Sequence, residues 1–123
     1  MNRQQKIPGP DHPITVEPSD AHVVVSTADA VIADSRHTLV LQEAAYPPVY
    51  YVPLGDVDPA VLRPTPTQTY CPYKGDASYY SVETPGGTVT DAVWRYAEPY
   101  PAVAQIAGHV AFYPDRVSVT VDA

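Results

Sequence analysis

Short runs of aliphatic and aromatic residues alternate with turns rich in proline, glycine and aspartate along most of the chain. Valine, threonine and tyrosine dominate these runs, and such residues favour the half-buried surface of a pleated strand. The pattern predicts about nine short strands, which cover 22–27, 30–35, 38–43, 49–52, 65–71, 77–84, 88–96, 109–113 and 117–121. Because no strand–helix–strand unit appears among them, the expected fold class is all-β, built of compact antiparallel sheets.

Only two segments have the marks of a helix, and each has room for a single turn. Asp58 suits the N-cap and Pro59 the first position of a turn over 58–62. A second turn is expected over 101–107, where Pro101 again takes the first position. The first three strands are joined by such short connections that we expect them to form an antiparallel meander.

Length and composition indicate a single domain that does not include the first residues of the chain. At 123 residues the chain is near the usual size of one domain, and its 15 prolines exclude long helices. Prolines and a glycine crowd the segment 1–13, which is predicted to be a flexible N-terminal arm; an arm packed across the body is the alternative. Residues 14–123 are predicted to form a single β domain.

The charge and the cysteine content limit the partners. The formal net charge is −7, and the few basic residues are dispersed, so binding to nucleic acid is not expected. One cysteine excludes an internal disulfide framework, and the four scattered histidines have no spacing typical of a zinc site. No apolar segment is long enough for a signal peptide or a membrane span. We therefore expect a cytoplasmic protein with no metal, cofactor or membrane partner; its oligomeric state is left open.

The densest group of reactive side chains lies in 67–79, around Cys71. A hairpin with the two-residue loop 74–75 is predicted there, and a second hairpin with the loop 86–87 is expected to follow. Side chains alternate between the two faces of a sheet, so these loops sort the residues into two rows. One face carries Tyr70, Tyr79 and Trp94, and the other carries Cys71, Ser78 and Arg95.

The row around Cys71 supports a catalytic hypothesis. A cysteine becomes nucleophilic when nearby cations lower its pKa, and both Lys74 and Arg95 are expected near Cys71. Glu43 ends a predicted strand and is followed by the bulky Tyr46, so it would be a covered carboxylate with a raised pKa that acts as a base. The alternative is a buried, inert cysteine with a solvated turn lysine, the common fate of these residue types.

A binding hypothesis uses the same region. Tyrosine and tryptophan form walls that suit planar ligands, and lysine or arginine binds an anionic group. The side chains expected to line such a polar and aromatic pocket are Arg36, Glu43, Tyr50, Thr69, Cys71, Lys74, Tyr79 and Trp94. The aromatic row is alternatively part of the core.

These observations leave three functions open. The first is a small-molecule-binding domain whose ligand is anionic or planar. The second is a hydrolase or transferase that uses Cys71 as nucleophile, with Lys74 and Glu43 as its helpers. The third is a protein-interaction module, because Pro53 is expected to place the strand 49–52 at a sheet edge, where a partner strand would dock.

Five distinctive segments are spread over nearly the whole chain: Ala33-Asp-Ser-Arg36, Tyr46-Pro-Pro-Val-Tyr-Tyr-Val-Pro53, Thr69-Tyr-Cys-Pro-Tyr-Lys-Gly-Asp-Ala-Ser-Tyr79, Asp91-Ala-Val-Trp-Arg-Tyr96 and Ile106-Ala-Gly-His-Val-Ala-Phe-Tyr113. These segments resemble those of the bacterial domain of unknown function 427 family. The resemblance implies a fold similar to the β-tent or Mss4-like architecture, without its zinc because the paired cysteines are missing.

The family is sometimes labelled a nucleotidyltransferase domain. Nucleotidyltransferases of the polymerase-β type place a glycine–serine pair ahead of a metal-binding Asp-x-Asp on a strand. The one Asp-x-Asp of this chain, at 56–58, follows Gly55 without a glycine–serine pair. The pairing of Asp58 with Pro59 indicates turn and capping roles instead.

Overall fold

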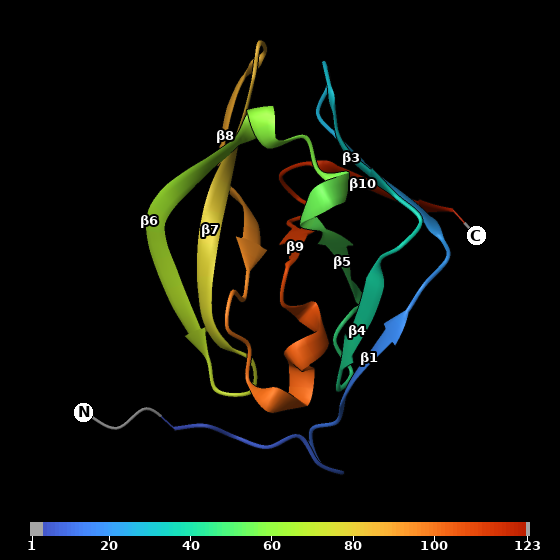
Figure 1. Cartoon of the computed structure of the whole chain (residues 1–123), viewed down its shortest axis with the longest axis vertical. Helices are drawn as coiled ribbons and strands as arrows, with labels where there is room; N and C mark the ends of the chain where they lie inside the picture. The colour runs from blue at the N-terminus through green and yellow to red at the C-terminus, as the bar shows by residue number, and fades with distance from the viewer. Residues whose placement is uncertain (1–3, 123) are drawn as a thin grey trace.

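The computed structural model describes residues 4–122 and contains ten strands and three short 3-10 helices (Figure 1). The all-β prediction is confirmed, since every strand pairing is antiparallel. The strands are β1 Ile14–Pro18, β2 His22–Ser26, β3 Val31–Ser35, β4 Leu39–Glu43, β5 Val49–Pro53, β6 Leu62–Cys71, β7 Gly75–Thr84, β8 Gly87–Arg95, β9 His109–Phe112 and β10 Ser118–Asp122. The helices are η1 Leu54–Asp56, η2 Pro59–Val61 and η3 Pro101–Ile106.

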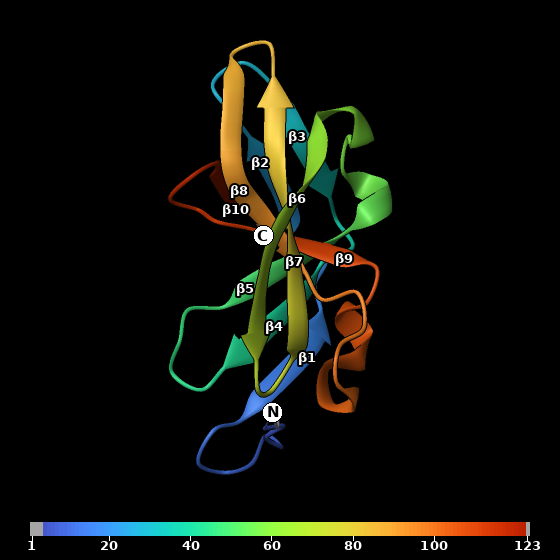
Figure 2. The same cartoon turned by 90° about the vertical axis from the view of Figure 1, so that its left-hand side faces the viewer.

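The strands form two sheets that lie against each other (Figures 1 and 2). The larger has seven strands in the order β1-β4-β5-β9-β8-β7-β6, and the smaller has three in the order β10-β2-β3. The predicted meander is therefore wrong at its third strand. β4 leaves β3 and pairs with β1 on one side and β5 on the other, because the connection at 36–38 crosses from one sheet to the other.

Two features of the larger sheet differ from the sequence prediction. Strand β1 is additional; it lies at the sheet edge, where Pro18 is tolerated because its missing N–H is not needed for a ladder. Strand β5 ends at Pro53, as expected, but it lies inside the sheet between β4 and β9. The edge that the interaction-module hypothesis assigned to this strand is therefore occupied at Val52 and Pro53, which pair with β9.

The β6–β7 hairpin has a different register from the predicted one. Cys71 pairs with Gly75, so the loop holds three residues, Pro72 to Lys74. Proline favours the first central position of such a turn, the Lys74 N–H donates to the Cys71 carbonyl at 3.2 Å, and Gly75 has a φ of 110°, which glycine adopts at little cost. The slip moves Cys71 to the face that carries Tyr79.

The predicted register of the β7–β8 hairpin is correct around Tyr79 and wrong at the tip of the hairpin. Tyr79 pairs with Trp94 and Ser78 with Arg95, as predicted, but Thr84 pairs with Gly87, which makes 85–86 the loop. A bulge around Asp91 in β8 absorbs the difference. Asp91 has a φ of 51°, and its carboxylate accepts hydrogen bonds from the hydroxyls of Thr65 and Thr67 at 2.7 Å each, which tie the bulge to β6.

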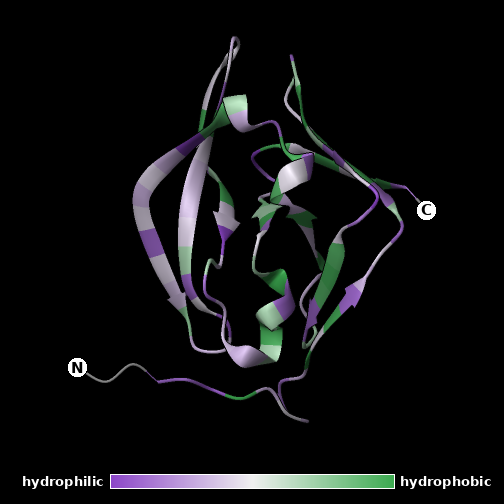
Figure 3. Cartoon of the chain, in the orientation of Figure 1, coloured by the Kyte–Doolittle hydropathy of each residue, from purple (hydrophilic) through white to green (hydrophobic). Residues whose placement is uncertain are grey.

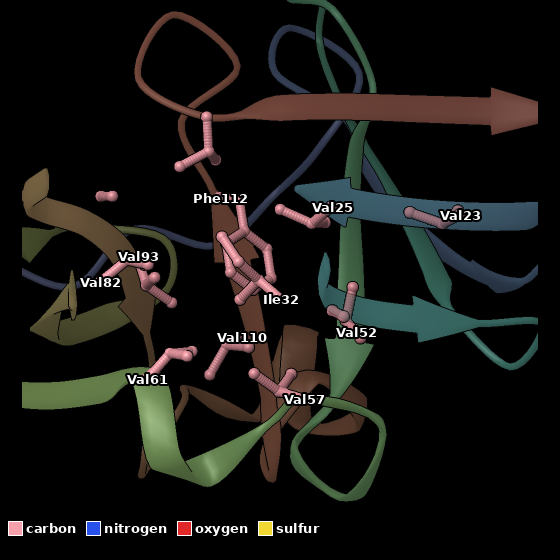
Figure 4. Packing of buried hydrophobic residues seen from close by; sticks show 13 residues of the cluster. Val23, Val25, Ile32, Val52, Val57, Val61, Val82, Val93, Val110 and Phe112 are labelled. Atoms are coloured by element: carbon pink, nitrogen blue, oxygen red, sulfur yellow. The ribbon is translucent and has the colours of Figure 1, made fainter. Parts of the chain in front are cut away.

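The core consists of two clusters on opposite faces of the seven-stranded sheet. The first fills the space between the two sheets, where residues such as Val25, Val93 and Phe112 point toward one another (Figure 4). The second lies inside the curl of the larger sheet, where Leu41 and Ile106 belong to it and η3 closes its lower end (Figure 1). Hydrophobic residues accordingly concentrate on β4, β5 and η3, while the outer strand β6 is largely polar (Figure 3).

Within residues 4–122, no helix is long and apolar enough to cross a membrane.

Candidate functional site

A buried ion pair lies at the lower end of the second cluster. Glu43 is the last residue of β4, and Lys74 is the last residue of the β6–β7 loop; both segments reach the lower end of the molecule (Figure 1). Lys74 Nζ donates to Glu43 Oε1 at 2.5 Å. Their side chains are only 10% and 17% exposed, so the pair is largely removed from water. Lys74 is thus not the solvated turn residue that its type suggests.

The loop after β4 holds Glu43 in place. Ala44 adopts a φ of 47°, which turns the chain back immediately after the carboxylate. The Gln42 side-chain amide donates to the carbonyls of Ala44 and Tyr46, and the Tyr46 N–H donates to the Glu43 carbonyl at 2.9 Å. These contacts bring Tyr46 and Pro47 over the cavity in which the carboxylate lies.

The charge environment of Glu43 is the reverse of the expected one. Burial alone raises the pKa of its carboxyl, but hydrogen bonds and charge interactions with Lys74 and His12 outweigh burial, and the pKa is lowered from its usual 4.5. The predicted raised pKa is therefore wrong. The error arises because Lys74 and Glu43 are 31 positions apart, and the sequence pattern does not show that they pair.

The lowered pKa of Glu43 predicts how the stability of the protein changes with pH. Because folding lowers the pKa of Glu43, its contribution to stability is present above about pH 4.5 and is lost as the pH falls through the folded-state pKa. We expect Glu43→Gln to flatten the acid limb of the stability curve, measured by urea unfolding between about pH 5 and pH 3. Glu17→Gln, at an exposed position of β1, is the matched control. A Glu43→Gln curve as steep as that of the native chain would contradict the prediction.

The described part of the N-terminal arm covers this ion pair. His12 Nε2 lies 2.8 Å from Glu43 Oε2, and the His12 ring stacks on Tyr73 with 4.2 Å between ring centroids. The Lys6 N–H donates to the Pro72 carbonyl at 2.8 Å. In Figure 1 the arm accordingly runs below the β6–β7 turn. The division into an arm and a domain stays a prediction, but His12 is a site residue that the sequence analysis missed, because no motif connects it to Glu43.

Aromatic side chains form the walls beside the ion pair. Trp94 and Tyr113 lie 4.5 Å apart between ring centroids, and Trp94 Nε1 donates to the Tyr51 hydroxyl at 3.2 Å. Burial raises the pKa of Tyr51, and burial together with the Tyr79 hydroxyl raises the pKa of Tyr113 to about 12. Both phenols therefore stay protonated at neutral pH and offer O–H donors as well as acceptors.

The ion pair and these walls enclose a cavity of about 250 Å³. Four of the side chains that were predicted to line a pocket do line this cavity, namely Glu43, Lys74, Tyr79 and Trp94. Tyr51, Tyr96 and Tyr113 also line it and were not predicted as site residues. Tyr51 lies within β5, whereas Tyr96 and Tyr113 directly follow β8 and β9, and no sequence motif sets these tyrosines apart from the others.

The remaining predicted residues lie at different distances from this cavity. Thr69 is beside it, with its hydroxyl 2.9 Å from that of Tyr79. Cys71 packs against the second cluster on the same face of the sheet. Tyr50 points to the opposite face of β5, toward the first cluster. Arg36 lies in a separate hollow beside Asp20, so the structure does not bring it to Lys74.

The arrangement expected around Cys71 is not formed. Arg95 lies on the other face of the sheet, where its guanidinium donates to the Tyr80 hydroxyl at 3.2 Å. Lys74 turns its ammonium to Glu43. Both cations invoked to activate the thiol thus have other partners, and a nucleophilic Cys71 stays a prediction without support from the geometry.

The Asp-x-Asp segment has the structural roles expected of it. Asp58 caps η2, with its carboxylate accepting from the Ala60 N–H at 2.9 Å. Asp56 accepts from the Ser35 hydroxyl at 2.6 Å, which links η1 to β3. Across residues 4–122, no group of three histidine, cysteine, aspartate or glutamate side chains is placed to hold a metal ion.

Comparison with protein families identifies the domain. A family model described as a domain of unknown function (DUF427) matches residues 15–123. The chain belongs to the DUF427 family. The search of curated proteins found no match. In this DUF427 domain the ion pair and the aromatic walls lie inside the matched range, whereas His12 precedes it.

Proposed function

We propose that this DUF427 domain binds a small planar molecule in the cavity between the Lys74–Glu43 pair and the aromatic walls. The observation that supports the proposal is the ion pair itself. Two opposite charges are kept largely out of water at the edge of an open space, an arrangement that costs desolvation free energy on both groups. A ligand that hydrogen-bonds to both charges would recover part of that cost.

The groups around the cavity favour a neutral ligand with both a donor and an acceptor. Lys74 has further N–H donors beyond the one that Glu43 accepts, and Glu43 is acceptor-only. An anion would bind Lys74 but would face the Glu43 carboxylate at close range, so it would have to displace it. The Trp94 and Tyr113 rings supply a surface on which a flat molecule stacks. Amides and nitrogen heterocycles combine these properties.

Binding is tested with the only tryptophan of the chain, Trp94, as reporter. We expect saturable changes in its fluorescence on titration with a panel of planar amides and heterocycles, and weaker changes with matched carboxylates. Lys74→Met should weaken binding of the best amide at least tenfold, because a buried charge-assisted hydrogen bond contributes about 1.5–3 kcal/mol. Circular dichroism at the assay temperature confirms that the variant is folded.

Arg36→Met is the control, since it removes a cation outside the cavity. Equal loss in both variants, or a panel in which no compound gives a saturable change, would refute the proposed function. Preference for the carboxylates over the amides would keep the site but show that the anionic alternative is the correct ligand class.

A further inference from the structure

A second hollow lies on the other face of the seven-stranded sheet. It has a volume of about 420 Å³ and is bordered by β2 and β10 of the small sheet and by β5 and β9 of the large one. Its lining is almost entirely hydrocarbon, including Val23, Val25, Phe112, Val119 and Val121. The volume is within the usual range of small-molecule sites, and it is concave rather than flat, which fits a ligand better than a protein surface.

The two hollows share part of their lining near the place where β5 and β9 separate. The β5–β9 ladder consists of the pairs Val52–Val110 and Pro53–His109, so the two strands are no longer paired along the first half of β5. Val49 begins β5 at this opening, and Trp94 faces it from β8. These two residues, with Tyr46 and Pro47 of the preceding loop, line both hollows.

We propose that the two hollows form one amphiphilic site. A planar polar head occupies the Lys74–Glu43 cavity, and an alkyl or aryl tail passes Trp94 into the valine-lined hollow. This inference rests on the proposed function and adds the ligand class to it. The two linings differ in chemistry. Charged groups and tyrosine hydroxyls border one hollow, mostly carbon borders the other, and four residues border both.

A homologous series of probes tests the tail. We would measure the affinity of benzamide and of 4-alkylbenzamides with increasing chain length by isothermal titration calorimetry. Each methylene that enters the hollow should improve affinity about fourfold, the factor expected for burial of one CH₂ group. The improvement should stop when the hollow is full.

Variants of the hollow separate the tail from the head. Val119→Phe fills the hollow, so it should abolish the dependence on chain length and leave benzamide binding unchanged. Val31→Phe, at an exposed valine of β3 outside the hollow, should change neither. Should Val119→Phe fail to fold, Val121→Asp at the exposed rim replaces it, since a charge there opposes entry of a tail. Lys74→Met should weaken every member of the series by the same factor.

Three outcomes would overturn the inference, and they have different consequences for the proposed function. Benzamide binding without any dependence on chain length removes the tail site but keeps the proposed function. Chain-length dependence that Lys74→Met does not shift shows that the hollow binds apolar groups by itself and that no head is held at the ion pair. Absence of binding by every member removes the amphiphilic site and, with the negative panel above, the proposed function too.

Discussion

We expect Lys74→Met to lower the free energy of unfolding by about 3 kcal/mol at neutral pH, the lower end of the range for breaking a buried ion pair. The lower end applies because both partners keep some exposure and because His12 still hydrogen-bonds to the carboxylate. The variant leaves Glu43 among aromatic side chains without its main cation. Urea unfolding followed by circular dichroism measures the change.

The pH dependence of this variant provides an internal check. Without Lys74, only His12 opposes the effect of burial, so the pKa of Glu43 should lie above its value in the native chain, and the variant should lose less stability than the native chain as the pH falls. The double variant Lys74→Met with Glu43→Leu should recover most of the loss, because neither charge then remains buried. A loss below about 1 kcal/mol, the value typical of surface pairs, would show that the pair is solvated.

We expect Ile106→Ala to cost about 3 kcal/mol or more of unfolding free energy, a value typical of deleting a buried aliphatic side chain. Ile106 ends η3 and is fully buried in the second cluster. The substitution removes apolar contact and leaves a cavity that the surrounding sheet cannot close, because η3 is held by its own turn contacts. Urea unfolding again gives the measurement.

Two further substitutions calibrate this effect. Ile106→Val removes one methyl group and should cost about 1 kcal/mol. Val31→Ala, at a valine that is 59% exposed, should change stability by no more than about 0.5 kcal/mol. Similar losses in Ile106→Ala and Val31→Ala would mean that η3 does not close the core.

Local chemistry was enough to predict most of the fold. Turn residues marked the strand ends, and the Asp58–Pro59 pair located η2. Register depended on information that is not local. The segment Pro72-Tyr-Lys-Gly75 is compatible with either a two-residue or a three-residue loop. The three-residue loop that forms places Cys71 on the other face of the sheet from the one predicted. The Tyr79–Trp94 pairing was predicted correctly only because the bulge at Asp91 compensates for a shifted tip.

The candidate site was harder to predict than the fold for the same reason. The sequence analysis placed Glu43 and Lys74 in one pocket but did not predict their ion pair, because it depends on how β4 and the β6–β7 loop meet across the curl of the sheet. His12 and Tyr113 have no distinctive neighbours in the sequence, and only the closed fold brings them to the cavity. Arg36 belongs to a family-like segment, yet it lies outside the cavity.

The contact between His12 and Glu43 also affects how the protein should be trimmed. A domain boundary taken from family similarity falls at residue 15, after the imidazole that hydrogen-bonds to the carboxylate. A chain shortened to that boundary would lose Ile14, the residue of β1 that pairs with Glu43, and one of the two side chains that hold Glu43 charged. Acid titrations and ligand affinities measured on the shortened chain would therefore describe an altered site.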